Sequence, residues 1–303
     1  MRILVTGISG QVGHDLLGTL APLGEVVGVD RAAMDLASPE TMRAALRALA
    51  PTLIVNPAAY TAVDRAETEP ELAMRINAEA PAVLAEEARR LGAWLVHYST
   101  DYVFDGSRHG PYREDDPPAP LGAYGRSKCA GEEAIAASGC AHLILRTSWV
   151  YSLRGRNFLT TLFRLASERD TLRVVADQVG APTSSQAIAR ATARLAERIR
   201  DGTLSPGDGG LFHMTCGGST SWHGFAQAIM DRLPAVARAL GEPAPGRVPA
   251  VLPIRTEEYP TPARRPANSV LDNGKLARVF GVRLPLWSDA LDALLSAPDA
   301  AGA

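Results

Sequence analysis

The feature that most constrains this chain is a glycine-rich turn close to its N-terminus. A short apolar run at residues 3–5 leads into Gly7, Gly10 and Gly13, and a helical pattern follows at residues 15–20. Glycines at such a turn let the backbone approach a pyrophosphate, and the N-terminus of the following helix offers free N–H groups. The order strand, glycine turn and helix therefore predicts a dinucleotide site, although the spacing is G-x-x-G-x-x-G and not the commoner G-x-G-x-x-G.

An acidic residue ends the second apolar strand, at residues 26–29. Asp30 stands where a dinucleotide-binding fold contacts the ribose 2′-hydroxyl, which favours NAD. Arg31 follows at once and can accept the 2′-phosphate of NADP. The two residues indicate opposite preferences, so the sequence leaves NADH and NADPH open.

Apolar strands and helical segments alternate through the first half of the chain. The further strands are predicted at residues 53–56, 94–99 and 142–146, and the helices at residues 39–50, 69–91 and from 124 onward. This alternation predicts the α/β class, with a doubly wound parallel sheet of the Rossmann type. We expect residues 1–150 to form this dinucleotide-binding domain, together with about 172–200, where a sixth strand at 172–175 and a helix are predicted. Residues 151–303 otherwise form a smaller C-terminal α/β substrate domain.

Composition and charge exclude several classes of protein. The net charge is −2 and no basic patch is present, so no nucleic-acid partner is expected. No apolar run is long enough for a membrane span, and the chain starts directly with a strand and not with a signal peptide, which predicts a cytoplasmic protein. The 3 cysteines, Cys129, Cys140 and Cys216, have neither the number nor the spacing of a disulfide framework or a zinc site.

Tyr124 and Lys128 are the first candidates for chemistry. They are four residues apart at the start of a predicted helix, so they lie on the same face. A nearby ammonium lowers the pKa of a phenol, which makes the phenol a usable general acid or base. A surface helix with an exposed lysine has the same spacing, however. Thr100, at the carboxyl end of the fourth strand, adds a hydroxyl that can donate a hydrogen bond into the same site.

The glycine turn, Thr100, Tyr124 and Lys128 together resemble the extended short-chain dehydrogenase/reductase family with its hydroxyl–Tyr–Lys triad. Asn77, within Ile-Asn-Ala, looks like the asparagine motif of that family. Within the family, four segments resemble the dTDP-4-dehydrorhamnose reductases, namely residues 97–104, 146–151, 177–183 and 259–266. The resemblance implies reduction of the C4 ketone of dTDP-4-dehydro-L-rhamnose by NADH or NADPH. This is the last step of dTDP-L-rhamnose biosynthesis, which supplies a nucleotide sugar for cell-envelope polysaccharide.

The resemblance and the dinucleotide pattern together assign site residues. The expected cofactor contacts are Gly7, Gly10, Gln11, Val12, Gly13, Asp30, Arg31, Asp35, Leu36, Ala59, Tyr60, Thr61, Tyr98, Tyr124 and Lys128. The expected catalytic residues are Tyr124 as proton donor, Thr100 as hydrogen-bond donor, and Lys128, which lowers the pKa of Tyr124 and holds the nicotinamide ribose.

The resemblance places sugar contacts at Thr100, Asp101 and Trp149, since a flat apolar ring packs well on a deoxysugar. Without the resemblance, a core position is the better interpretation of Trp149, because tryptophan is highly buried on average. Arg264 or Arg265 can bind the diphosphate bidentately or form a salt bridge, and Arg265 is our candidate for the substrate contact.

One departure from the family concerns a metal ion. Family members with a magnesium-linked dimer carry acidic residues at two positions, which are Asp15 and the neutral Gln186 here. A hard cation prefers charged oxygens, so we expect no metal site, and Mg²⁺ is doubtful although Asp15 keeps its charge. The choice between monomer and homodimer stays open.

Other functions remain possible on the same fold. A nucleotide-sugar 4,6-dehydratase would carry Glu where Tyr102 stands. Another NDP-4-ketosugar reductase or epimerase is an alternative, and an epimerase would keep its NAD through purification. A non-catalytic regulatory subunit, resembling that of methionine adenosyltransferase, has no need of Thr100, Tyr124 and Lys128 together.

Overall fold

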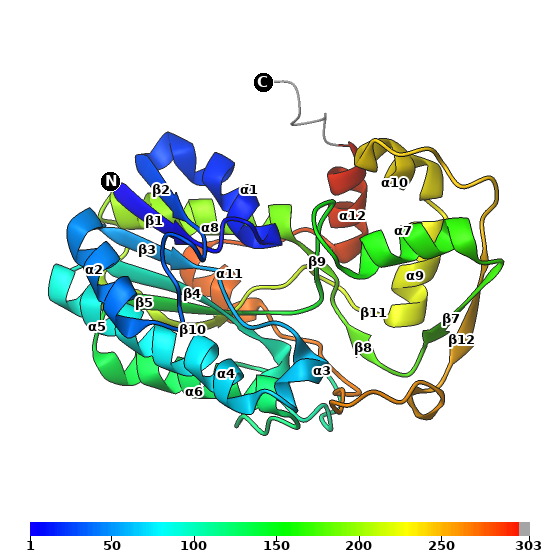
Figure 1. Ribbon diagram of the computed structural model, residues 1–303, viewed down its shortest axis with the longest axis horizontal. Coiled ribbons are helices and arrows are strands. Elements are labelled where there is room, and N and C mark those ends of the chain that lie inside the picture. Colours follow the sequence, from blue (N-terminus) through cyan, green and yellow to red (C-terminus); the bar gives the residue numbers. More distant parts are fainter. Residues whose placement is uncertain (297–303) are drawn as a thin grey trace.

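The computed structural model describes residues 1–296, which form a larger and a smaller lobe (Figure 1). The larger lobe is built on one 6-stranded sheet. In spatial order its strands are β10 (Gly210–His213), β5 (His142–Thr147), β4 (Trp94–Thr100), β3 (Leu53–Asn56), β1 (Arg2–Thr6) and β2 (Glu25–Val29). All neighbouring strands pair in parallel. The predicted doubly wound α/β fold is therefore confirmed.

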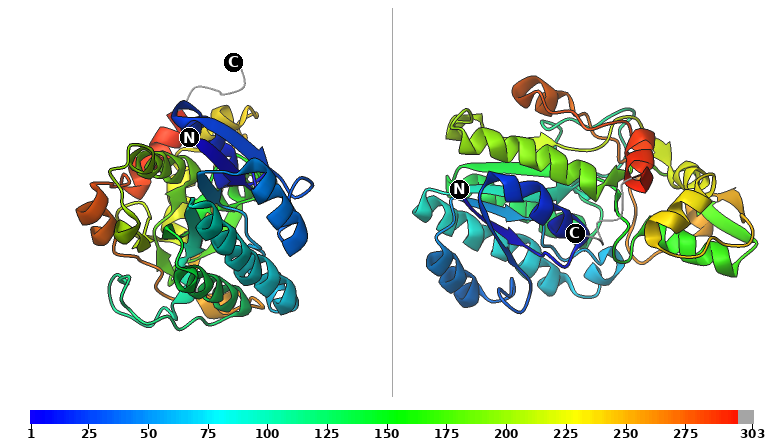
Figure 2. Two further views of the ribbon diagram at one scale, coloured as in Figure 1. Left: turned by 90° about the vertical axis from the view of Figure 1, so that its left-hand side faces the viewer. Right: turned by 90° about the horizontal axis from the view of Figure 1, so that it is seen from above.

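Helices cover both faces of this sheet, as Figure 2 shows from two sides. One face packs against α1 (Gln11–Leu20), α8 (Ser185–Arg200) and α11 (Gly274–Phe280). The other face packs against α2 (Pro39–Leu49), α5 (Ala80–Leu91) and α6 (Ala123–Ser138). Every residue of β3 and β4 is buried, as a parallel sheet covered on both faces requires.

The polypeptide leading to α5 lies at the carboxyl edge of the sheet. It contains α3 (Val63–Ala66), α4 (Pro70–Met74) and a π-helical turn, Arg75–Glu79, that continues into α5. Single π-helical turns within α-helices often occur at functional sites. Short 3₁₀ turns complete the regular structure at Ala21–Leu23, Asp101–Val103, Pro206–Asp208 and Thr256–Glu258.

The smaller lobe has its own apolar core. Its helices are α7 (Phe158–Glu168), α9 (Trp222–Met230), α10 (Leu233–Leu240) and α12 (Trp287–Ser296), and they pack around Tyr151, Leu159, Phe225, Leu233 and Leu291. A parallel pair of strands, β7 (Thr171–Val175) and β12 (Ala250–Ile254), lies against them. There are two further short pairs, β6 (Val150–Tyr151) with β9 (Thr183–Ser184), and β8 (Val179–Gly180) with β11 (Thr220–Ser221). The labels β8, β9 and β11 in Figure 1 lie between the two lobes.

The sixth strand of the main sheet differs from our prediction. β10 takes this place beside β5, whereas the segment predicted for it, β7, pairs with β12 and contributes Leu172 and Val174 to the core of the smaller lobe. The helix predicted after it, α8, does lie in the larger lobe, where it packs on α1. The chain thus returns to the larger lobe between β7 and α8. Residues 297–303 of the predicted substrate domain lie outside the described residues.

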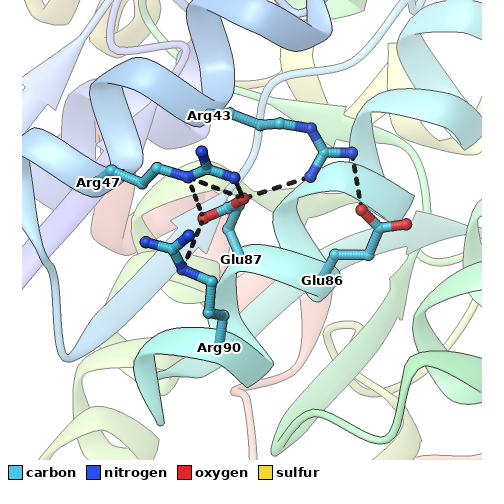
Figure 3. Close-up of polar contacts among 5 residues, drawn as sticks. All are labelled: Arg43, Arg47, Glu86, Glu87 and Arg90. Atoms are coloured by element: carbon cyan, nitrogen blue, oxygen red, sulfur yellow. Dashed lines mark hydrogen bonds and ion pairs between the residues drawn. The ribbon is translucent and has the colours of Figure 1, made fainter.

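A buried carboxylate connects two helices on one face of the sheet (Figure 3). Glu87 on α5 is 2% exposed and pairs with Arg47 at 2.6 Å and Arg43 at 3.3 Å, both on α2. Arg90, on α5 itself, approaches to 3.7 Å. The hydrogen bonds from Arg47 lower the pKa of Glu87, against the opposing effect of burial. This cluster holds α2 on α5.

Among the described residues, none of the helices has the length and apolar character that a membrane span requires.

Candidate active site

The glycine turn between β1 and α1 has the geometry that its sequence predicts. Gly7 has a positive φ of 57°, which favours glycine. A Cβ atom on Gly13 would lie only 2.3 Å from the carbonyl oxygen of Gly7, so the turn and the helix pack too closely for any side chain. Gly10 is the N-cap of α1. The turn therefore brings the free N–H groups of a helix N-terminus to the carboxyl edge of the sheet.

A cavity of about 680 Å³ opens at this edge, and we call it the nucleotide pocket. Every residue that we expected to contact the cofactor lines it: Gly7, Gly10, Gln11, Val12, Gly13, Asp30, Arg31, Asp35, Leu36, Ala59, Tyr60, Thr61, Tyr98, Tyr124 and Lys128. Ligands of open parallel sheets bind at the carboxyl ends of the strands. The pocket thus has the position of a dinucleotide site.

Asp30 and Arg31 lie side by side at the edge of this pocket. The Asp30 carboxylate accepts hydrogen bonds from the backbone N–H groups of Ala32 and Ala33, each at 3.0 Å. The Arg31 side chain is 82% exposed, and its guanidinium lies 3.7 Å from the Asp35 carboxylate. The carboxylate is therefore fixed by the backbone, while the arginine side chain lies largely in solvent.

Sequence analysis missed two further basic residues of the nucleotide pocket. Arg154 and Arg156 line it from the loop that follows β6. The same loop is joined to the glycine turn, because the Ser152 hydroxyl donates a hydrogen bond to the Gln11 side chain at 3.0 Å. The sequence Arg-Gly-Arg at residues 154–156 could have indicated a phosphate contact, but these residues lie in the segment that we had assigned to the substrate domain.

Tyr124 lies in the first turn of α6, next to the end of β4. Burial raises the pKa of Tyr124 to about 12, although the Thr100 hydroxyl acts in the opposite direction. Thr100 is buried; its hydroxyl donates to Asp101 Oδ1 at 3.1 Å and accepts from the Tyr102 N–H at 3.2 Å. Burial also raises the pKa of Asp101 to about 6. At neutral pH the site therefore holds a protonated phenol beside a hydroxyl that an ionised carboxylate orients.

Lys128 lies one turn further along α6 and is 2% exposed. Its ammonium donates to the carbonyl oxygen of Tyr98 at 2.6 Å and contacts His97 Nε2 at 3.0 Å. Burial lowers the pKa of Lys128 to about 8, with a smaller opposing effect of Glu132. We had expected Lys128 to lower the pKa of Tyr124. The structure instead gives Tyr124 a pKa above the ordinary value, because burial dominates and the ammonium is directed to His97 and Tyr98.

Asn77 fixes the wall of the pocket. It lies in the π-helical turn and is fully buried. Its side chain accepts from the N–H of Tyr60 at 2.8 Å, and donates to the Tyr60 carbonyl and to the Ser127 hydroxyl, each at 3.0 Å. Asn77 thus connects the loop after β3 to α6, one residue away from Lys128.

The expected sugar contacts stand apart from the lining of the nucleotide pocket. Trp149, just beyond β5, has a positive φ of 48°, which is strained for a bulky residue. Its ring stacks on Trp222 of the smaller lobe, with centroids 3.6 Å apart and planes 7° apart. A Cβ atom on Gly180 would lie 2.5 Å from the Trp149 ring, so the strand β8 packs tightly against it. The aromatic pair therefore lies where the two lobes meet.

Arg265 is engaged within the protein. Its guanidinium pairs with Asp64 at 2.9 Å and lies 5.8 Å from the centroid of the Tyr102 ring. These contacts are the salt-bridge alternative that the sequence left open. They fix the segment after β12 to α3, beside the Thr100–Tyr124 pair.

Asp15 and Gln186, the two positions considered above for a metal ion, have other surroundings here. The Asp15 carboxylate accepts a hydrogen bond from the Ser185 hydroxyl at 2.5 Å, and Gln186 is neutral. Gln186 shares a small cavity with Arg190, Arg194 and Arg283, whose charges oppose a cation. Within residues 1–296, no group of three or more His, Cys, Asp or Glu side chains is placed to hold a metal ion. The neutral Gln186 amide and the neighbouring guanidinium groups are therefore a poor donor set for Mg²⁺.

Known proteins are similar to this chain over nearly its whole length. Residues 1–299 match the family described as the RmlD substrate binding domain. A dTDP-4-dehydrorhamnose reductase of Burkholderia thailandensis is 50% identical over 292 residues, covering 96% of this chain and 97% of the relative. The enzyme of the same name from Salmonella typhimurium is 43% identical over 302 residues, covering 98% and 97%.

A solved structure is also similar. The dTDP-4-dehydrorhamnose reductase of Bacillus anthracis, in complex with NADP, superposes with a TM-score of 0.87 at 34% identity, covering 97% of this chain and 98% of that one. Sequence and fold thus agree, and the chain belongs to the RmlD substrate binding domain family.

Proposed function

We propose that this chain is an oxidoreductase that reduces the C4 ketone of dTDP-4-dehydro-L-rhamnose to dTDP-L-rhamnose, with NADH or NADPH as the reductant. The observation that carries the proposal is the position of Tyr124 and Lys128, which line the pocket that the glycine turn closes. The family membership and the names of the close relatives support the same reaction.

In this proposal the two lobes bind different molecules. The larger lobe, with residues 1–150 and α8, binds the cofactor, and the smaller lobe supplies much of the sugar-nucleotide site. Asp30 would hold the adenosine ribose, and Arg31, Arg154 and Arg156 offer positive charge for phosphates. The similar Bacillus anthracis enzyme is in complex with NADP. When bound, the nicotinamide cofactor supplies the hydride that is transferred to C4 of the sugar.

The protein residues then act on the oxygen of the ketone. Tyr124 donates its phenolic proton to this oxygen as negative charge develops on it. Its raised pKa, about 12, keeps the proton on the phenol until the stronger base appears. The Thr100 hydroxyl, which donates to Asp101 in the free protein, would turn its hydrogen to the same oxygen when the ketone is bound. Lys128 holds the nicotinamide ribose, for which it retains one N–H that neither His97 nor Tyr98 uses.

The substrate would lie where the lobes meet. Trp149 offers an apolar ring to the deoxysugar, and Trp222 supports this ring from behind. Arg265, although paired with Asp64, lies beside the site through its contact with Tyr102 and remains our candidate for the diphosphate. We place the reaction in the cytoplasm, in a monomer or a homodimer, without a nucleic-acid or membrane partner and without a required metal.

The direct test is oxidation of NADH and NADPH by the purified protein in the presence of dTDP-4-dehydro-L-rhamnose. We expect turnover with the keto-sugar, no turnover without it, and no effect of EDTA. Protein that retains NAD through purification and interconverts sugar epimers would indicate an epimerase. Absence of oxidation with either cofactor, combined with co-purification of a synthetase, would support the non-catalytic alternative.

A further inference from the structure

A row of buried polar residues lies beneath Lys128. Thr6, Asn56 and His97 occupy neighbouring positions on the parallel strands β1, β3 and β4, and each is at most 1% exposed. Each comes two residues after a core residue, namely Leu4, Ile54 and Leu95. Because side chains alternate along a strand, the three polar residues point to the face that α6 covers. Apolar side chains at these three positions would fill the core equally well. The burial of three polar side chains therefore needs an explanation other than packing.

The polar row forms a chain of contacts that ends on Lys128. The Thr6 hydroxyl lies 2.6 Å from Asn56 Oδ1, and Asn56 Nδ2 lies 3.0 Å from His97 Nδ1. On the far side of the ring, His97 Nε2 lies 3.0 Å from Lys128 Nζ. The imidazole thus occupies the space between a strand-end carboxamide and the lysine.

The chemistry of these groups determines the direction of the hydrogen bonds. An ammonium only donates, so His97 Nε2 accepts and the neutral ring carries its hydrogen on Nδ1. Burial lowers the pKa of His97 well below its ordinary value, and the charge of Lys128 lowers it further, which keeps the ring neutral. Rotation of the Asn56 carboxamide exchanges its oxygen and nitrogen, so that the oxygen accepts from Nδ1–H and the nitrogen donates to Thr6.

No carboxylate among the described residues pairs with Lys128. The nearest acid on α6, Glu132, is one turn away and is bound by Arg146 of β5 in two hydrogen bonds. From β4, only His97 and the Tyr98 carbonyl contact the ammonium. The neutral imidazole is therefore the side chain that fixes the position of the lysine.

We propose that His97 is a positioning residue for the reaction: by accepting a hydrogen bond from Lys128, and being held in turn by Asn56 and Thr6, it keeps the ammonium charged and aimed at the nucleotide pocket. This inference rests on the proposed function for its effect on catalysis. The contact itself is open to a separate test, because it determines how readily Lys128 loses its proton.

Two substitutions separate the two sides of the ring. Glutamine at this position reaches about as far as Nε2 and can still accept from Lys128. Asparagine reaches about as far as Nδ1, so it can contact Asn56 but not the lysine. Both variants, His97→Gln and His97→Asn, keep a buried polar side chain. His213→Asn is the matched control, since His213 is also fully buried at a strand end, on β10, and does not contact Lys128.

The sequence makes a direct measurement practical, because Lys128 and Lys275 are its only lysines. Protein labelled with ¹³C at lysine Cε gives two side-chain signals by NMR, and Lys275→Arg assigns them. In His97→Asn we expect the titration midpoint of Lys128 to fall by about one pH unit, since a hydrogen bond to the charged form is lost. In His97→Gln and His213→Asn it should stay near the wild-type value. Equal midpoints in His97→Asn and His97→Gln, or an equal fall in His213→Asn, would overturn the inference.

Kinetics provide the second measurement. For His97→Asn we expect kcat/KM with the keto-sugar to fall roughly tenfold near neutral pH, with the alkaline decline in activity starting at lower pH, and for His97→Gln to restore both. A His97→Asn enzyme with the wild-type pH profile would contradict the role in catalysis. If the wild-type protein itself does not reduce the keto-sugar, the proposed function fails, while the lysine titration still decides whether His97 positions Lys128.

Discussion

Two buried charged residues on consecutive turns of α6 differ in how their charges are paired. Glu132 on α6 receives two hydrogen bonds from Arg146, at 2.8 and 2.6 Å, and so is fully compensated. Lys128, one turn earlier and also buried, has a neutral ring and a carbonyl as its hydrogen-bond partners among residues 1–296. Burial therefore moves the pKa of Lys128 toward neutrality. The comparison indicates that the Glu132 turn stabilises the fold, while the Lys128 turn keeps a charge that a bound molecule can use.

The largest effect is expected on the functional side of this comparison. Tyr124→Phe removes the proton donor and should lower kcat about 10²–10⁴-fold, with little change in cofactor affinity or in the free energy of unfolding. Steady-state kinetics measure kcat, cofactor titration measures the affinity, and urea denaturation measures the free energy of unfolding. Tyr102→Phe is the control, because Tyr102 packs edge-on against Tyr124, with ring centroids 5.7 Å apart, and has no assigned proton-transfer role. Wild-type kcat in Tyr124→Phe would contradict the assignment.

The next effect is expected on the structural side. Glu132→Gln leaves the buried Arg146 without its counter-charge, and we expect the free energy of unfolding to fall by about 3–5 kcal/mol. Urea denaturation measures the loss. The exposed neighbour gives a matched control, Glu133→Gln, for which about 0.5 kcal/mol or less is expected. A small loss in Glu132→Gln would show that the pair contributes little to the fold.

The third prediction concerns the pH dependence that Lys128 confers on stability. Between about pH 8 and pH 10.5 the unfolded chain still binds the lysine proton, whereas the folded protein has released it. The unfolded state thus binds more protons, so the stability contributed by this group rises with pH across that window. Relative to Lys128→Met, the wild-type free energy of unfolding should rise by about 2–3 kcal/mol over this range. Parallel pH curves for the two proteins would argue against a lowered pKa.

The smallest effect is expected at the Glu87 cluster of Figure 3. Its carboxylate is buried like that of Glu132, but its arginine partners are more exposed than Arg146. Glu87 is buried, but the side chains of Arg43, Arg47 and Arg90 are 34%, 45% and 57% exposed. Because water reaches these arginines, Glu87→Gln should cost only about 1–2 kcal/mol. Denaturation of Glu87→Gln and of the exposed control Glu86→Gln compares the two sites. A loss as large as that in Glu132→Gln would show that exposure of the partner is unimportant.

Local patterns in the sequence predicted much of the fold and of the nucleotide pocket. The glycine turn, Asp30 and the small residues after β3 each follow a strand directly, and parallel strands bring all of these positions to one edge. Tyr124 and Lys128 required only helical spacing. The identity of the sugar came from the resemblance, and not from any of these patterns.

Contacts between distant segments could not be predicted in this way. The neighbourhood of Thr6, Asn56 and His97 depends on the register of three strands, which no local pattern encodes. β7 has the apolar character of a sheet strand, but its actual partner, β12, lies in a proline-rich stretch, and frequent prolines ordinarily indicate a loop. The pKa of Tyr124 was misjudged because burial, which raises it, is a property of the folded chain and not of a local pattern.

The stacked indoles of Trp149 and Trp222 have a spectroscopic consequence. One follows the end of a strand in the larger lobe, and the other is the first residue of α9 in the smaller lobe. Aromatic rings held in parallel contact couple their electronic transitions, and the coupling weakens as the rings separate. The near-ultraviolet circular dichroism of the protein should therefore report the spacing between its lobes without any added label.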